Sequence, residues 1–351
     1  MKSSKIVFIR PWQVELGEAE LPHHPPEAHQ VYLRNLYSLV SPGTELACLS
    51  GGETWFPLPG TPGYVGVGEV LAVGDQVTKV AIGDKALTYG PHAGVYAVDT
   101  LDRHTGMCLK LDANSPRLDL VPFTRTATIP FTAIRVSEIE LGDWVVVTGL
   151  GLIGNFAAQL ARLQGANVIG VDVSASRRET ASRCGIEHTV DSSDPAWKDA
   201  VRQLAGSRGV TTLIDATGLS AVIADAAELV ASYGEAILLG SPRAEYVTDV
   251  TKVFNRIHLP GFTQFKGALE WRYPTFRDEF VKHSIERNSE IVLELIAANR
   301  LAVEPLYTHK LNPEQAGEGY RGLREDKEKY LGVIFDWTEF SASGERGIRA
   351  A

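Results

Sequence analysis

The pattern of hydrophobic and polar residues changes its period once along the chain, close to residue 120. Before this point, short runs with strand-like composition, such as residues 5–9 and 30–39, are separated by turns rich in glycine and proline. From about residue 121 onward, apolar residues recur at helical spacing, and strands alternate with helices. The pattern therefore predicts two domains, a β-rich one followed by an α/β one.

Closely spaced turns characterise the β-rich part. Residues 63–84, GYVGVGEVLAVGDQVTKVAIGD, alternate strand-like runs with two Gly-Asp turns, at Gly74-Asp75 and Gly83-Asp84. Short strands joined in this way are typical of a small, partly open barrel.

Regular repetition of strand and helix characterises the α/β part. One strand is expected to begin at residue 144, two others are expected to end at residues 172 and 191, and further strands are expected at 211–216, at 235–240 and within 257–271. Helices are expected at 176–184, 195–205, 221–231 and 276–299. Such alternation predicts a parallel, doubly wound sheet. Strands at 306–311 and 329–335 fit the first domain better, so we expect that domain to be discontinuous (1–123 and 301–351), with the α/β domain at 124–300.

A glycine-rich turn, GLGLIG at residues 149–154, joins the first strand of the α/β part to its first helix. In a βαβ unit, Gly149 would allow the tight turn and Gly151 would let the backbone approach a pyrophosphate. Leu152 and Ile153 would supply the helix N-terminus that faces this group, and Gly154 would let helix and strand pack closely. The spacing predicts a dinucleotide site.

Asp172 ends the second strand of this βαβ unit. A carboxylate there accepts hydrogen bonds from the adenosine ribose and repels the 2′-phosphate of NADP, which favours NAD. Arg177 and Arg178 leave NADP open, because an arginine pairs well with a phosphate, although Arg177 could equally stack on the adenine.

Composition and charge narrow the class of protein. A chain of 351 residues that is 44% hydrophobic and 22% charged can fill two cores. A net charge of −9, with scattered lysines and arginines, argues against a nucleic-acid partner. No apolar run reaches the roughly 18 residues of a membrane span, and no signal peptide is visible. With three widely spaced cysteines, these features predict a cytoplasmic protein that binds no membrane.

Several motifs together resemble the medium-chain dehydrogenase/reductase family over nearly the whole chain. They are Gly43-Thr44-Glu45, PGYVGVGEV at 62–70, the paired Gly-Asp turns, GDWVVVTGLGLIG at 142–154 and THKLNPEQAGEGY at 308–320. The resemblance implies a GroES-like domain beside a Rossmann domain, hydride transfer to or from a nicotinamide cofactor, and a homodimer.

The sequence departs from the zinc-dependent members of that family at the metal-binding positions. Those members commonly carry a cysteine before the Gly-Thr, a His-Glu pair after the glycine of the second motif, and a cysteine or glutamate before the nucleotide domain. Here these places hold Pro42, the pair Tyr64-Val65, and Thr124 or Arg125. None of these side chains suits zinc. Arg125 could occupy the space with its own positive charge.

The ligands of a second, structural zinc site are also missing from this sequence. Family members that carry it have four cysteines between about residues 85 and 110, where this chain has only Cys108. We therefore expect no zinc. The alternative is a different metal site built from histidines elsewhere, such as His23-His24.

Without zinc, another group must handle the proton of an alcohol. Tyr64 is the first candidate, with a packed aromatic as the alternative. The resemblance adds Thr44 as a proton relay, and it adds His92 and Lys266 as further candidates, although His92 could be a solvated loop residue and Lys266 a surface ion pair. It implies substrate contacts for Glu45, Arg125, Glu270 and Trp271, and cofactor contacts for Gly240, Ser241, Thr217 and Thr128.

Three functions remain open on this evidence. The first is a zinc-independent, NAD-dependent oxidoreductase of a secondary alcohol on a sugar, cyclitol or similar polyol. The second is a reductase of a quinone or an activated C=C bond that uses NAD(P)H, against which Asp172 counts. The third is a protein that binds NAD as a sensor without catalysis. In each case the partner is a small molecule.

Overall fold

The computed structural model describes residues 2–20 and 24–339. These residues form two compact units. The first unit comprises the described residues up to Thr126, then Pro274–Ala298, and those from Leu306 onward. The second comprises Ala127–Tyr273 and Asn299–Pro305. Within the described ranges, no helix is both long enough and apolar enough to span a bilayer.

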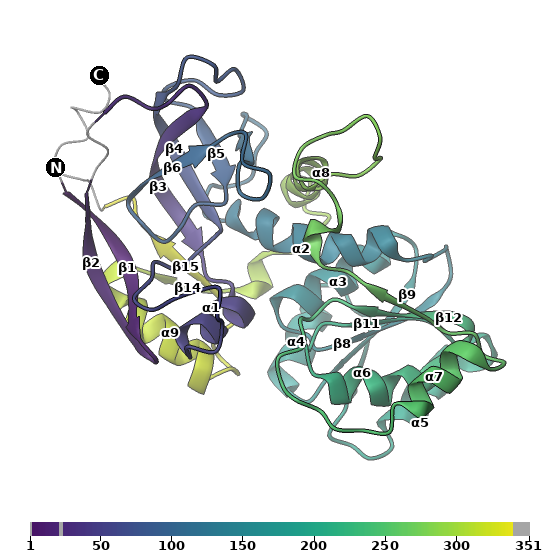
Figure 1. Cartoon of the computed structure of the whole chain (residues 1–351). Helices are drawn as coiled ribbons and strands as arrows, with labels where there is room; N and C mark the ends of the chain where they lie inside the picture. Colours follow the sequence, from purple (N-terminus) through teal and green to yellow (C-terminus); the bar gives the residue numbers. More distant parts are fainter. Residues whose placement is uncertain (1, 21–23, 340–351) are drawn as a thin grey trace. The chain divides into compact units, whose positions relative to one another are not determined.

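The first unit is built on a mixed, mainly antiparallel sheet of seven strands (Figure 1). Its order is β14-β15-β3-β4-β5-β7, with β6 also paired to β3. The strands are β3 (Gln30–Leu39), β4 (Gly66–Val73), β5 (Lys85–Thr88), β6 (Val95–Asp99), β7 (Cys108–Lys110), β14 (Tyr307–Leu311) and β15 (Gly332–Asp336). Strands β1 (Lys2–Arg10) and β2 (Gln13–Glu20) form a separate antiparallel hairpin. Because β15 pairs with β3, strands from both ends of the chain share one sheet.

In the described part of the first unit, the helices are α1 (Pro42–Leu49), α8 (Ile285–Ala297) and α9 (Ala316–Glu325). A fourth, α2 (Pro122–Val136), contains the boundary between the two units. Helix α1 was not expected, because Pro42-Gly43 reads as a turn. Pro42 nevertheless stands in the first helical turn, where a missing N–H costs nothing.

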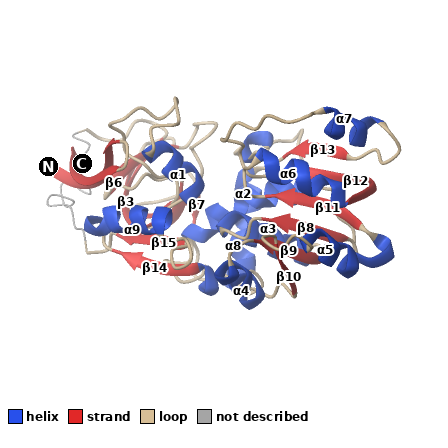
Figure 2. Cartoon of the chain, turned by 90° about the horizontal axis from the view of Figure 1, so that it is seen from below, coloured by secondary structure: helices blue, strands red, loops and turns tan. Residues whose placement is uncertain are grey.

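The second unit holds six parallel strands in the order β10-β9-β8-β11-β12-β13. They are β8 (Trp144–Thr148), β9 (Asn167–Asp172), β10 (His188–Asp191), β11 (Val210–Asp215), β12 (Val230–Leu238) and β13 (Gln264–Gly267). The helices are α3 (Leu152–Leu163), α4 (Ala175–Arg183), α5 (Trp197–Ala205), α6 (Ser220–Ala226) and α7 (Thr251–His258). Helices flank the sheet (Figure 2), and the predicted Rossmann fold is confirmed.

The described residues also include single turns of 3-10 helix. They are Gly206–Arg208, Ala227–Leu229, Glu270–Arg272, Glu304–Leu306 and Pro313–Gln315.

The observed units differ from the expected boundaries mainly in residues 274–298, which the sequence placed in the α/β domain, and also at 124–126 and 301–305. The reason is burial: Ile285 packs against Val67 and Leu87 of the first unit. Glu286 also pairs with Lys79 at 2.5 Å. The helix expected at 276–299 is shorter, because Ser284 caps it and it begins only at Ile285.

A second helix is also shorter than expected. The sequence placed it at 221–231, but α6 ends at Ala226 and β12 already begins at Val230. Val230 is buried in the core of the second unit and pairs with Val210 of β11, so sheet pairing takes over from the helix there.

Candidate functional site

The glycine-rich turn between β8 and α3 is shaped by close contacts that leave one open position. Gly149 has a φ of 83°, and a Cβ there would lie 2.9 Å from Cγ2 of Thr217. A Cβ on Gly154 would lie 1.6 Å from the Gly149 carbonyl oxygen, so packing alone requires this glycine. A Cβ on Gly151 would meet nothing within 4 Å. Open space remains above the turn, as the approach of a diphosphate requires.

Helix α3 starts at this turn with Leu152 and Ile153. Gly151 is its N-cap residue and offers no side-chain oxygen to the first N–H groups. An uncapped helix N-terminus with positive partial charge favours an anion. The turn and the helix start therefore fit the diphosphate of a dinucleotide.

Asp172, at the end of β9, is buried and does more than the sequence indicated. Its Oδ2 accepts from the Leu150 amide at 2.7 Å, and its Oδ1 accepts from the Ser174 amide at 2.9 Å. The Arg177 guanidinium lies 3.7 Å from Oδ2. Asp172 thus holds the glycine-rich turn, and a carboxylate has further acceptor sites for ribose hydroxyls.

The loops after β11 and β12 lie against each other at the carboxyl end of the sheet. Thr217 and Gly218 follow β11, and Gly240 and Ser241 follow β12. A Cβ on Gly218 would lie 2.6 Å from the Ser241 carbonyl oxygen. The structure thus brings Gly149, Thr217 and Ser241 to one edge, and places Thr128 buried in α2.

Lys266 on β13 does not fit the role of proton acceptor that was considered for it. Its Nζ lies 2.7 Å from carboxylate oxygens of both Glu138 and Glu235. Burial lowers the pKa of Lys266, but the hydrogen bonds to the two carboxylates outweigh it and raise the pKa overall. An ammonium held in this way stays protonated, so Lys266 is an ion-pair residue of the sheet edge.

Glu270 and Trp271 lie together in one 3-10 turn of the second unit. Glu270 is buried, whereas the Trp271 side chain is half exposed. Their proposed contact with substrate stays a prediction.

A cluster of hydroxyl groups forms in the first unit around Tyr64. The phenol oxygen lies 2.5 Å from Oγ of Ser41 and donates to Oγ1 of Thr44 at 3.5 Å. The Arg125 guanidinium is fully buried and lies 5.5 Å from the Tyr64 ring centre and 4.1 Å from that of Tyr89. The structure thus brings Tyr64, Thr44 and Arg125 together, and adds Ser41, which sequence reasoning missed.

His92 and Glu45 are part of a buried chain of hydrogen bonds, and neither is a surface group. Nε2 of His92 lies 3.0 Å from Oε2 of Glu45, and Nδ1 lies 2.7 Å from Oγ of Ser38. Trp337 donates to the same Ser38 oxygen at 2.9 Å, and Tyr320 donates to Glu45 at 2.5 Å.

This chain of hydrogen bonds accounts for the polar groups of both residues. Burial, followed by the adjacent Glu45, raises the pKa of Tyr320 well above its ordinary value, so the phenol stays a donor. His92 is 0% exposed and Glu45 is 2% exposed. The expectations of His92 as a cleft or solvated loop residue, and of Glu45 as a substrate contact, are corrected: both are core residues. Glu45 also accepts a hydrogen bond from the Ser41 amide at 2.7 Å, so it helps to hold the main chain of Ser41 in place.

In residues 2–20 and 24–339, no three His, Cys, Asp or Glu side chains gather in a way that could hold a metal ion. Cys108 is buried, and desolvation raises its pKa to about 12, which disfavours the thiolate that zinc requires. His23 lies outside the described residues.

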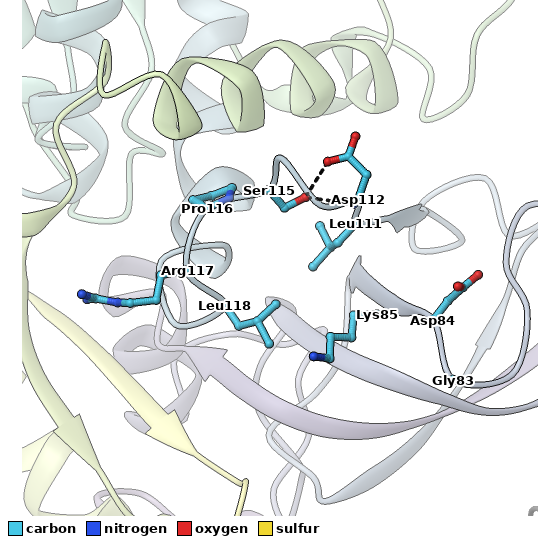
Figure 3. Close-up of a pocket in the computed structure, with 9 residues that line it drawn as sticks. All are labelled: Gly83, Asp84, Lys85, Leu111, Asp112, Ser115, Pro116, Arg117 and Leu118. Carbon is cyan, nitrogen blue, oxygen red and sulfur yellow. Dashed lines mark hydrogen bonds between the residues drawn. The ribbon is translucent and has the colours of Figure 1, made fainter.

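A hollow of about 450 Å³ lies in the first unit (Figure 3). It is lined by the segments 83–85, 111–112 and 115–118. None of the candidate residues contributes to it.

The chain is similar to a family profile, to named relatives and to solved structures. A family profile described as "Zinc-binding dehydrogenase" matches residues 153–278. The D-guloside 3-dehydrogenase of Escherichia coli (strain K12) is 30% identical over 278 residues, which cover 78% of this chain and 77% of that protein. A 2-haloacrylate reductase from Burkholderia sp. is 24% identical over 267 residues, or 75% and 78% of the two chains.

Among solved structures, a short chain alcohol dehydrogenase (rspB) from Escherichia coli CFT073, complexed with NADH, aligns with a TM-score of 0.79. The alignment covers 95% of this chain and 99% of that one, at 16% sequence identity. At this identity the likeness shows the fold alone.

Proposed function

Because this chain belongs to the medium-chain dehydrogenase/reductase family, whose members are oxidoreductases, we propose a specific activity within it. The protein is a zinc-independent, NAD-dependent dehydrogenase of a secondary alcohol on a sugar, cyclitol or similar polyol. The observation that carries this proposal is the cluster of three hydroxyls, from Ser41, Thr44 and Tyr64, beside the buried guanidinium of Arg125.

The cluster can perform the proton transfer that oxidation of an alcohol requires. NAD, where it is bound, would supply the acceptor for the hydride of the carbon that bears the hydroxyl. Tyr64 handles the proton of that hydroxyl, and in the reverse direction its phenol donates to the carbonyl oxygen. Ser41 and Thr44 orient the phenol through their hydroxyls. The positive charge of Arg125 favours the negative charge that develops on oxygen during transfer.

The choice of a hydroxyl-rich substrate has two supports. The relative at 30% identity is named as a dehydrogenase of position 3 of a D-guloside. Hydroxyl groups that both donate and accept, as in this cluster, suit a polyol. A panel of sugars, cyclitols and polyols with NAD, followed by the absorbance of reduced nicotinamide, tests the proposal directly.

NAD is favoured over NADP because of Asp172. Its buried carboxylate would face a 2′-phosphate as a like charge, and the Arg177 guanidinium lies 3.7 Å from that same carboxylate. Arg177 therefore already has an anionic neighbour.

A second function has one observation in its favour. One relative is named as a 2-haloacrylate reductase, an enzyme that acts on an activated C=C bond. The same assay with NADH or NADPH and enoates or quinones separates the two activities. Tight NAD binding without turnover on either panel would favour the third candidate, a non-catalytic NAD sensor.

Zinc content is expected to be nil. Pro42, Tyr64 and Arg125 stand where zinc-dependent relatives would have ligands, and none of them binds zinc. Purified protein should therefore contain no stoichiometric zinc by elemental analysis, and a chelator should leave activity unchanged. About one zinc per chain would contradict the proposal.

We also propose a homodimer that pairs through the β13 edge of the second unit. β13 is the last strand of its sheet, and the neighbouring helix α7 has no buried residue. Val250 just before α7, together with Phe254 and Ile257 within it, exposes apolar side chains at helical spacing. Apolar surface beside an open sheet edge is typical of an interface.

Phe254→Glu is expected to convert the dimer to a monomer, because it places a charge in the proposed contact. Light scattering on the eluting protein measures the mass. Ile82→Glu in the first unit is the matched control, since Ile82 is 56% exposed and Phe254 59%. A monomeric unmodified protein, or a dimeric Phe254→Glu variant, would contradict the prediction.

A further inference from the structure

One carboxylate connects the ends of three neighbouring strands at the carboxyl edge of the second unit. Asp215 ends β11, the strand between β8 and β12. In the register of the sheet it lies opposite Thr148 of β8 on one side and Leu238 of β12 on the other. It is 2% exposed, and neither the fingerprint nor the family resemblance pointed to it.

The Asp215 side chain accepts hydrogen bonds from hydroxyls and main-chain amides. Oδ1 accepts from the Thr148 hydroxyl at 2.8 Å, and from the hydroxyl and amide of Thr217 at 2.7 and 3.3 Å. Oδ2 accepts from the Gly218 amide at 3.3 Å. A buried carboxylate is costly unless such donors satisfy it, and donors bound to a charge are held more firmly than donors bound to a neutral group.

The main chain of Asp215 adds the third strand end. Its carbonyl oxygen accepts from the amides of Leu239 and Gly240, at 2.9 and 2.7 Å. A single residue therefore links the end of β8, the turn after β11 and the loop after β12.

The turn after β11 packs closely against the loop after β12 and against the glycine-rich turn. A Cβ on Gly240 would lie 2.2 Å from the Gly218 amide nitrogen. On the other side, Thr217 lies so close to Gly149 that a Cβ on that glycine would be 2.9 Å from Cγ2 of the threonine. The Thr217 hydroxyl also accepts from the Leu219 amide at 3.1 Å, which orders the turn further.

We infer that Asp215 is a positioning residue for the nucleotide. Through Thr217 and Gly218 it holds the turn after β11 against the glycine-rich turn, so that the surface of the edge has its binding shape before a ligand arrives. Asp215 does not itself touch the cofactor. This inference rests on the proposed function in one respect, that a nicotinamide dinucleotide binds at this edge. Preorganisation of this kind raises affinity by lowering the ordering cost of binding.

Asp215→Asn in the full chain tests the inference, because the amide fills the same space but turns an N–H₂ group toward donors. The dissociation constant of NAD, measured by calorimetry, is expected to rise at least about fivefold. All titrations are made well below the melting temperature of each variant, measured without ligand. A purely structural role would lower that temperature and leave the dissociation constant unchanged.

Two further variants and a control keep the test sharp. Thr148→Val removes one donor to Asp215 and should weaken NAD binding in the same direction, whereas Thr148→Ser keeps the hydroxyl and should restore it. If Asp215→Asn does not fold, this pair carries the test. Asp143→Asn is the matched control, because Asp143 accepts from the Glu140 amide in the turn before β8, at the opposite end of that strand.

The outcomes separate the inference from the proposed function. Unchanged NAD affinity in Asp215→Asn, or equal affinities in Thr148→Val and Thr148→Ser, would overturn the role of Asp215 and leave the proposed function standing. An unmodified chain that binds neither NAD nor NADP would overturn both.

Discussion

Replacement of Tyr64 by phenylalanine is expected to lower turnover by about a hundredfold or more, while the fold and the NAD affinity are retained. The change preserves the ring that packs near Arg125 and removes only the oxygen bonded to Ser41 and Thr44. A hundredfold loss is the usual scale for a general acid or base. Steady-state rates over a range of pH should also lose the limb that reports this group.

Three controls distinguish proton transfer from loosened packing. Tyr96→Phe removes a hydroxyl from another buried tyrosine, whose partner is Thr88, and should leave turnover within a few-fold. Lys266→Met and His92→Asn should leave the pH limb in place, because both residues have other partners. Turnover within a few-fold in Tyr64→Phe would show that Tyr64 is merely packed.

Removal of the Asp172 carboxylate is expected to raise the preference for NADP over NAD by at least about tenfold. Each charge-assisted hydrogen bond to ribose contributes roughly 1.5 to 3 kcal/mol, and each 1.4 kcal/mol is one decade in affinity. Asp172→Ser removes both the bonds to the ribose and the repulsion of a 2′-phosphate. The measurement is the ratio of the dissociation constants of NADP and NAD, because a general loosening of the turn would weaken the binding of both cofactors alike.

Asp172→Asn refines the same prediction, since the amide can still accept from the Leu150 amide that Asp172 holds. It should change the cofactor ratio in the same direction with less loss of stability. Asp143→Asn is the control, because Asp143 accepts from the Glu140 amide in the turn before β8, at the opposite end of the sheet. An unchanged ratio in both Asp172 variants would mean that this carboxylate does not face the ribose.

The sequence predicted the second unit well because its signals are local. Strand and helix periods are read within a dozen residues, and the glycine spacing of the turn at 149–154 lies within six. Helix α1 was missed because Pro42-Gly43 reads as a turn unless the burial of Cys48 and Leu49 is known. The position of Ile285 was missed for the same reason, since its partners lie some 200 residues away in sequence.

Roles assigned to polar residues were less predictable, because they depend on partners that the chain brings from far away. His92 was read from its loop, yet Ser38, Glu45 and Trp337 enclose it. Lys266 was read from its neighbours in the sequence, yet Glu138 pairs with it. The sequence shows which side chains are polar, but the fold determines which of them form hydrogen bonds or ion pairs with one another.

Two residues missed at first carried a usable signal. Asp215 ends an apolar strand, VTTLID, as Asp172 ends NVIGVD, so the same reasoning about carboxyl ends of parallel strands applied to both. Ser41 directly precedes the proline that opens a helix, a position that favours serine. Its contact with Tyr64 could not be foreseen from that position.

The place of β15 between β14 and β3 has a consequence for synthesis on the ribosome. β3 is translated early, but its partner at Gly332–Asp336 leaves the exit tunnel only after residues 127–273 of the second unit have been made. Domains fold as units during translation, so the second unit can fold while the sheet of the first unit still lacks β14 and β15. During that interval residues 37–39 of β3 lack their partner strand, and unpaired strand edges attract other chains. The nascent protein is therefore expected to need chaperone protection for the half of its fold that begins first and finishes last.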